Sequence, residues 1–413
     1  MRLHVLGTMG LVLCAASVAA CSGSGGTAAT VTPGAGPTAS PSPTPSISPT
    51  PTPKPSSSPT VAPTATPTPK PSITPSPSPT PVASSGACAI PTPTPGSTAL
   101  VYVVNDNPDK VEVYAGNPNG AVNEAPLATI AGSNTGLGRP QGIAVDAAGK
   151  IYVANASPPS VTVYAANPSG TLNEAPLATI AGSNTHLAQP QGIAVDGCGN
   201  IYVGQGPWYT ANSGLSPYSV TVYAPNPSGT LNETPIGEID PTATTMAYTN
   251  GGIVLDSANR IYVTTQGVDQ NGKPFGLLVY AANPRGAVNQ PPVAQINGSN
   301  TAGAYGSGIA LDAQGRIYVV DNSSSPAIDV YASNPVGLQN EAPLATIMGS
   351  NTQLFYPGFI AVDAAGNIYV DDPNGGLNVF APNPSGSLNE APAASINAGN
   401  NALLNQPSGI ALH

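Results

Sequence analysis

The sequence has few ionisable side chains. Charged residues make up 7% of its 413 residues, and the three histidines, His4, His186 and His413, lie far apart. Metal sites built from several histidines and acid–base pairs of histidines need such residues in groups, so the sequence gives no sign of either. Seven basic and 20 acidic residues lie beyond residue 100, a formal charge of -13 for that part. This balance argues against a nucleic-acid partner, which would need basic contacts to phosphate.

Long apolar runs are also scarce. Only the run from Val5 to Val18 approaches the length of a membrane-spanning segment, and it follows Arg2 and precedes small residues, which is the pattern of an export signal. The stretch Val18-Ala-Ala-Cys21 resembles the lipobox of bacterial lipoproteins, which implies that Cys21 becomes the lipidated first residue of the mature chain. Ordinary cleavage after Ala20 is the alternative. We therefore expect a lipoprotein-type signal peptide over residues 1–20.

Residues 21–97 lack almost every residue type that builds a core. They consist largely of Pro, Thr, Ser, Ala and Gly, with Lys54 and Lys70 as the charged residues. Such a segment cannot bury enough apolar surface to offset its conformational entropy, so we expect a disordered stalk with polyproline II character. The chain is then an exported protein at the cell surface or in the periplasm, and it meets the membrane through the lipid anchor alone.

The remaining residues, 98–413, show no helical period and repeat about every 50 residues. The motif Gly192-Ile-Ala-Val-Asp196, followed by Ile201-Tyr-Val203, recurs in copy after copy, and a second shared passage runs from Ser160 to Ile180. Each copy contains four short β signals, here Gly192 to Val195, Ile201 to Val203, Ser219 to Ala224 and Pro235 to Ile239, bounded by turn residues. The turn Asp196-Gly-Cys-Gly-Asn200 and its copies predict a hairpin in which Asp shapes the turn.

The copies of these strands predict a closed ring. The second strand occurs six times, beginning with Val101 to Val103, whereas the first strand of the motif occurs last at Gly409 to Leu412. The chain thus begins on a second strand and ends on a first strand, so we expect these two to pair and close a ring of six four-stranded antiparallel blades. The motif is similar to the NHL repeat, the unit of six-bladed β-propellers. The predicted fold is therefore an all-β, six-bladed β-propeller.

Resemblance to NHL propellers implies a range of functions, from protein-binding platforms to lactonases, lyases and metal-dependent hydrolases. The related Ca²⁺-dependent lactonases hold their ion with Glu, Asn and Asp in the channel. In this chain several Asp and Asn side chains follow the second strands, and their oxygen atoms suit Ca²⁺. They form a candidate metal site of Asp321, Asp371, Asp372, Asn105 and Asp106. The alternative is that these residues cap the connection between the second and third strands.

Departures from the repeat suggest a second candidate site. Two connections after the second strand are longer than the others, and a third connection diverges in sequence; all three belong to one face. Exposed aromatic residues on long loops commonly form recognition surfaces. We therefore expect a ligand-binding patch of Trp208, Tyr209, Tyr218, Tyr248 and Phe275. Packing of the loops on themselves is the alternative.

Four cysteines occur in the chain. Cys14 would leave with the signal peptide and Cys21 would be lipidated, which leaves Cys88 and Cys198. Cys198 lies in a hairpin turn and Cys88 precedes the first predicted strand, so both are expected towards the same face. In an exported protein such a pair can be oxidised to a disulfide, so we expect a disulfide between Cys88 and Cys198.

These observations favour a monomeric, lipid-anchored binding module without catalytic residues or a cofactor, apart from the candidate Ca²⁺ site. Its ligand would be a protein, a peptide or a glycan. A Ca²⁺-dependent lactonase or hydrolase of the six-bladed propeller class is the alternative. A third interpretation is a purely structural domain displayed by the stalk.

Overall fold

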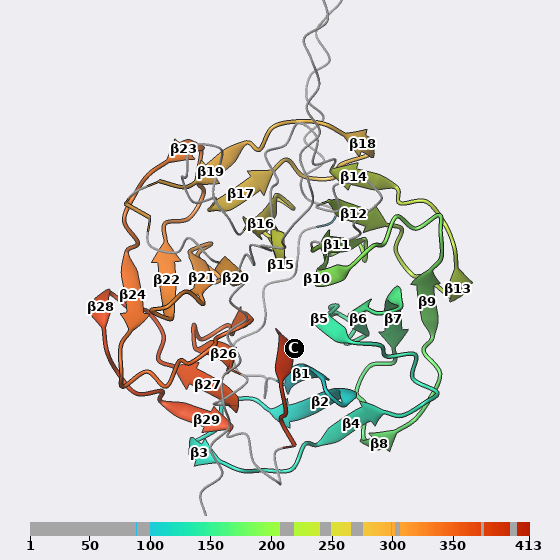
Figure 1. Cartoon of the computed structure of the whole chain (residues 1–413), viewed down its shortest axis with the longest axis horizontal. Coiled ribbons are helices and arrows are strands. Elements are labelled where there is room, and N and C mark those ends of the chain that lie inside the picture. Colours follow the sequence, from blue (N-terminus) through green and yellow to red (C-terminus); the bar gives the residue numbers. More distant parts are fainter. Residues whose placement is uncertain are drawn as a thin grey trace, which may run out of the picture. The chain divides into compact units, whose positions relative to one another are not determined.

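The computed structural model describes residue 88 and residues 100–206, 219–239, 249–265, 276–298, 300–301, 306–372, 376–396 and 403–413. These residues belong to one compact unit and form six small sheets that follow one another around a ring (Figure 1). The predicted six-bladed β-propeller is confirmed. Among the described residues no helix is long and apolar enough to cross a membrane.

Each blade has four antiparallel strands, which run from the ring axis outwards. The innermost strands are β30 (Pro407–Leu412), β5 (Pro140–Val145), β10 (Pro190–Val195), β15 (Thr249–Leu255), β20 (Gly306–Leu311) and β25 (Ile360–Val362), for blades 1 to 6 in this order. The second strands are β1 (Leu100–Asp106), β6 (Ile151–Ala156), β11 (Ile201–Gln205), β16 (Ile261–Thr265), β21 (Ile317–Asp321) and β26 (Ile368–Asp372).

The two outer strands of each blade follow in the same blade order. The third strands are β2 (Asp109–Ala115), β7 (Pro159–Tyr164), β12 (Val220–Tyr223), β17 (Leu277–Tyr280), β22 (Ala327–Tyr331) and β27 (Gly376–Phe380). The fourth strands are β4 (Ala128–Ala131), β9 (Ala178–Ala181), β14 (Gly237–Ile239), β19 (Ala294–Ile296), β24 (Ala345–Met348) and β29 (Ala394–Ile396).

A fifth strand completes each sheet, and the sequence did not predict it. It has three residues, comes from the connection between the third and fourth strands of the next blade, and pairs in parallel with the fourth strand. These strands are β8 (Gly170–Leu172), β13 (Gly229–Leu231), β18 (Gly286–Val288), β23 (Gly337–Gln339), β28 (Gly386–Leu388) and β3 (Gly120–Val122). Each blade thus contributes one strand to the sheet of the preceding blade in the ring.

The ring closes between the two ends of the described chain. Strand β30 pairs antiparallel with β1, as the sequence predicted, and β3 pairs with β29 of blade 6. The backbone N–H of Leu100 donates to the carbonyl of His413 over 2.8 Å, and the N–H of His413 donates back to Leu100 over 3.0 Å. The hydrophobic core lies between blades, where one buried Tyr from each second strand packs against the neighbouring sheet.

The two faces of the ring differ in their connections. The turn face carries the hairpin turns between first and second strands, and the loop face carries the connections that precede the first strands and follow the second. On the turn face, Asp196 Oδ1 accepts the N–H groups of Cys198 and Asn200 over 3.0 and 2.9 Å, and Gly199 adopts a φ of +85°. The predicted role of these aspartates in shaping the turns is confirmed.

Candidate functional site

The second strand of most blades ends at the loop face with a buried polar side chain. Asn105, Asn155 and Gln205 each accept a backbone N–H from the loop that precedes the innermost strand of the same blade, at 2.9, 3.1 and 2.6 Å. Asp372 does the same in blade 6, where its Oδ2 accepts the N–H groups of Phe355 and Tyr356 at 2.5 and 3.1 Å. These residues hold the loops of the loop face in place.

Residues of the candidate Ca²⁺ site therefore have local partners. Asp371 Oδ1 accepts the N–H of Phe359 over 2.5 Å, and Asp106 Oδ2 accepts Nε2 of Gln141 over 3.3 Å. Asp321 Oδ1 accepts the N–H of Ser323 over 2.8 Å and so caps the connection to the third strand, as the alternative interpretation expected. Within the described ranges no group of three or more His, Cys, Asp and Glu side chains is placed to hold a metal. A Ca²⁺ site made of all five residues stays a prediction.

The predicted aromatic patch falls where the structure gives no description. Trp208, Tyr209, Tyr218, Tyr248 and Phe275 all lie outside the described residues. The prediction about them stays untested.

A different aromatic pair is visible on the loop face. Phe355 and Tyr356 are 54% and 66% exposed, although Asp372 binds both of their backbone N–H groups. The corresponding loops of blades 1, 2 and 3 carry Asn405-Gln406, Gly138-Arg139 and Ala188-Gln189, which are small or polar. Two large aromatic side chains are thus displayed on an anchored backbone. The sequence analysis missed them because it searched only the long or divergent connections; a residue-by-residue comparison of the equal-length loops would have found them.

Buried acids on the third strands form another feature that the sequence analysis missed. Glu112 of blade 1 is fully buried, and its carboxylate accepts Nζ of Lys110 at 2.8 Å, Nδ2 of Asn105 at 3.0 Å and the hydroxyl of Tyr114 at 3.1 Å. Burial raises the pKa of Glu112 although Lys110 acts in the opposite direction. Asp329 occupies the same position in blade 5, and burial raises its pKa to about 6.

The ring axis presents apolar side chains. The narrow cavity there is lined by one isoleucine from each blade, together with Phe359 and glycines. A Cβ added to Gly142 would lie 2.1 Å from the carbonyl oxygen of Gln191, so this glycine is needed for the close approach of neighbouring innermost strands. The residues that line this cavity include no acid, base or nucleophile.

Cys88 and Cys198 are joined by a disulfide, the pairing that the sequence suggested, with their Cα atoms 4.6 Å apart. The carbonyl of Cys88 also accepts the N–H of Gly197 and Nδ2 of Asn259, both at 2.9 Å. Cys88 is therefore fixed to turns of blades 3 and 4 on the turn face. The loop face lies on the other side of the ring from this attachment.

Comparison with known proteins shows similarity only to solved structures. No protein-family model matches the chain, and no curated protein matches it. It is similar to the PQQ-bound form of an aldose sugar dehydrogenase from Streptomyces coelicolor, at 17% identity and a TM-score of 0.46 over 67% of this chain and 86% of that chain.

Two further structures are similar to the chain. One is a protein of unknown function from Bacteroides caccae, at 12% identity and a TM-score of 0.47 over 76% of this chain and 99% of that chain. The other is the WD40 β-propeller domain of Doa1, at 11% identity and a TM-score of 0.42 over 69% of this chain and 76% of that chain.

Proposed function

We propose that the protein is an extracytoplasmic, lipid-anchored propeller of the NHL type that binds a peptide or a glycan on its loop face. The observation that carries this proposal is the exposed pair Phe355 and Tyr356. Aromatic side chains supply a large contact area at a low cost in conformational entropy, and they are enriched among the residues that dominate binding energies.

The geometry of the pair suits recognition. Because Asp372 binds the backbone of both residues, little of the loop has to be ordered when a ligand binds. The attachment of Cys88 to the turn face leaves the loop face on the opposite side of the ring, which suits a domain that a stalk presents to ligands. The stalk, the lipid anchor at Cys21 and the exported location are parts of this proposal that rest on the sequence.

Binding of the full chain to peptide and glycan arrays tests the proposal. The ligands that bind are then titrated against the wild type and the double variant Phe355→Ala, Tyr356→Ala. We expect at least a tenfold loss of affinity, which is about 1.4 kcal/mol, because the variant removes the aromatic contact area. The control is the double variant Val336→Ala, Leu338→Ala, which removes side chains that are 72% and 71% exposed elsewhere on the ring. Equal affinity of the aromatic variant and the wild type would contradict the proposed site.

A further inference from the structure

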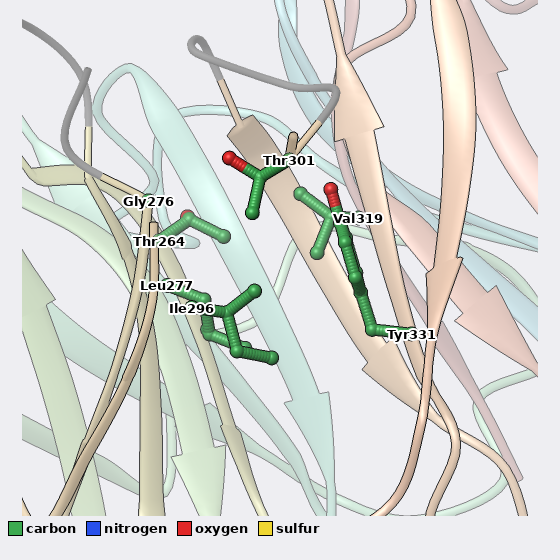
Figure 2. A pocket seen from close by; sticks show the side chains of 7 residues that line it. All are labelled: Thr264, Gly276, Leu277, Ile296, Thr301, Val319 and Tyr331. Carbon is green, nitrogen blue, oxygen red and sulfur yellow. The ribbon is translucent and has the colours of Figure 1, made fainter. Parts of the chain in front are cut away.

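A small cavity separates blades 4 and 5. It is lined from blade 4 by Thr264, Gly276, Leu277 and Ile296, and from blade 5 by Thr301, Val319 and Tyr331 (Figure 2).

Loop leucines pack between the blades at other junctions of the ring. At four other junctions a leucine of the loop packs on the buried residues that correspond to this lining: Leu137, Leu187, Leu354 and Leu404. The residue aligned with them in blade 5 is Gly303, which lies outside the described residues.

Two carboxylates lie on the same sheet face as two of the residues that line this cavity. Asp329 pairs with Val319 across the hairpin and precedes Tyr331 by two residues, so it shares a sheet face with both lining residues. Asp321 follows Val319 by two residues and lies on the same face. Side chains at these two positions meet in other blades: Nδ2 of Asn105 lies 3.0 Å from Glu112 Oε2, and Nδ2 of Asn155 lies 3.1 Å from Thr162 Oγ1. Burial and the charges of Asp329 and Asp321 together raise the pKa of Tyr331.

Asp329 is incompletely satisfied. Its side chain is fully buried, and Oδ1 accepts the hydroxyl of Thr346 at 2.7 Å, but Oδ2 has no hydrogen-bond partner in the part of the chain that the structure describes. Buried polar atoms are almost always paired, and an unpaired buried carboxylate oxygen is costly. The site therefore needs a group that can neutralise this oxygen.

Blade 1 shows which kind of group solves the same problem. There the buried acid Glu112 is neutralised by Lys110, whose ammonium lies 2.8 Å from the carboxylate. Lys110 pairs across the hairpin with Asn105, and the residue that pairs with Asp321 in the same way is Ala327. Blade 5 thus has one more acid than blade 1 at these positions and a methyl group in place of the ammonium.

We propose that the junction of blades 4 and 5 binds a calcium ion through Asp321 and Asp329. Two carboxylates offer the double negative charge and the oxygen ligands that Ca²⁺ prefers, and water molecules complete its coordination. The ion stands where the Lys110 ammonium stands in blade 1. This inference is independent of the ligand-binding function proposed above, because it concerns another junction and other residues.

Titration of the metal-free full chain with Ca²⁺ at pH 7.5 tests the site. Calorimetry measures the heat of binding, and thermal unfolding measures the change in Tm. We expect a saturable rise in Tm and heat of binding for about one ion per chain. Asp329→Asn should weaken binding at least tenfold, because it removes the unpaired carboxylate oxygen. Ala327→Lys should raise Tm without Ca²⁺ and abolish the response to the ion, because it supplies the ammonium of blade 1.

Glu112→Gln is the matched control, since it alters the buried acid at the equivalent position of blade 1 and should leave the Ca²⁺ response unchanged. Parallel titrations with Mg²⁺, K⁺ and NH₄⁺ identify the cation. The proposal is overturned by the absence of a saturable Ca²⁺ response, by an equal response in Asp329→Asn, or by a response to K⁺ or NH₄⁺ alone. A pH dependence of stability that Asp329→Asn removes, in a protein that does not respond to Ca²⁺, would assign a proton to the two acids and would also overturn it.

Discussion

Asp371 is a fully buried carboxylate, and burial raises its pKa to about 7. The nearby charge of Asp372 acts in the same direction, whereas the hydrogen bonds from the backbone of Phe359 and Gly358 oppose it. Between the pKa of an unfolded aspartate, about 3.9, and about 7, the folded state keeps a proton that the unfolded state has lost. The free energy of unfolding therefore falls as pH rises through this window, and the fall ends near pH 7.

Asp371→Asn should remove this part of the pH dependence and make the protein more stable than the wild type above pH 7. The expected gain is up to a few kcal/mol, since each unit of pKa difference corresponds to about 1.4 kcal/mol. Denaturant unfolding measured from pH 4 to pH 8 gives the slope. Asp329 contributes a smaller slope of the same sign, so some dependence should remain. Glu174→Gln changes an exposed acid and serves as the control; equal slopes for all three proteins would refute the assignment.

At the scale of residues, the sequence predicted the roles of residues that recur in the repeats, but it did not predict the roles of residues that occur in one repeat only. The turn aspartates were identified because Asp recurs at the start of these hairpin turns, mostly with Gly three residues later, and the structure shows the hydrogen bonds that this pattern implies. Asp329 was not identified because its importance depends on which side chains surround it. A single acid on an apolar strand gives no signal until the position of its neighbours, here Asp321 and Ala327, is known.

At the scale of elements, leucine side chains from the loops pack between neighbouring blades. Leu354 is 8% exposed and packs in the core cluster between blades 5 and 6. Leu354→Ala should lower the free energy of unfolding by about 2–3 kcal/mol, because it leaves a cavity between the sheets. Thermal or denaturant unfolding checks this value. Leu344→Ala is the matched control, since Leu344 is 54% exposed and its truncation should cost less than about 0.5 kcal/mol. Equal losses for the two variants would show that the loop leucines do not stabilise the junctions.

The four main strands of each blade could be predicted, but the fifth could not. Strands such as Ile201–Gln205 are rich in Val, Ile and Tyr and are bounded by turn residues, which is sufficient for recognition. The fifth strand has three residues and begins with an exposed glycine, as in Gly170–Leu172. Its hydrogen-bonding partner lies in another repeat, so no local pattern marks it.

At the scale of the whole molecule, strand β30 closes the ring. Deletion of residues 407–413 removes β30 and exposes the edge of β1 in blade 1. We expect the shortened protein to lose cooperative unfolding and several kcal/mol of stability, because the contacts of β30 with both neighbouring blades disappear. Thermal unfolding followed by circular dichroism measures the loss. A synthetic peptide of residues 403–413 should restore part of the transition when added in trans, whereas a scrambled peptide should not. An unchanged transition in the shortened protein would refute a role of closure in stability.

The number of blades and the manner of closure were predictable at this scale because both follow from counting repeats. The candidate ligand-binding site could not be predicted in this way, because it depends on departures from the repeat. Phe355 and Tyr356 differ from their counterparts in blades 1, 2 and 3 without changing the length of the loop. The aromatic residues that the sequence singled out lie outside the described part of the chain. Repetition therefore identifies the scaffold, while exceptions to it identify candidate sites.

The pairing of β30 with β1 also bears on how quickly the fold can form. Asn105 and the backbone of Asn405, which hydrogen-bond at this junction, are 300 residues apart in the sequence. Contacts of such large sequence separation cost loop-closure entropy before they stabilise the chain, and folds that depend on them form slowly. Ring closure is therefore expected to be a late step of folding, after the blades whose strands are consecutive in the sequence have formed.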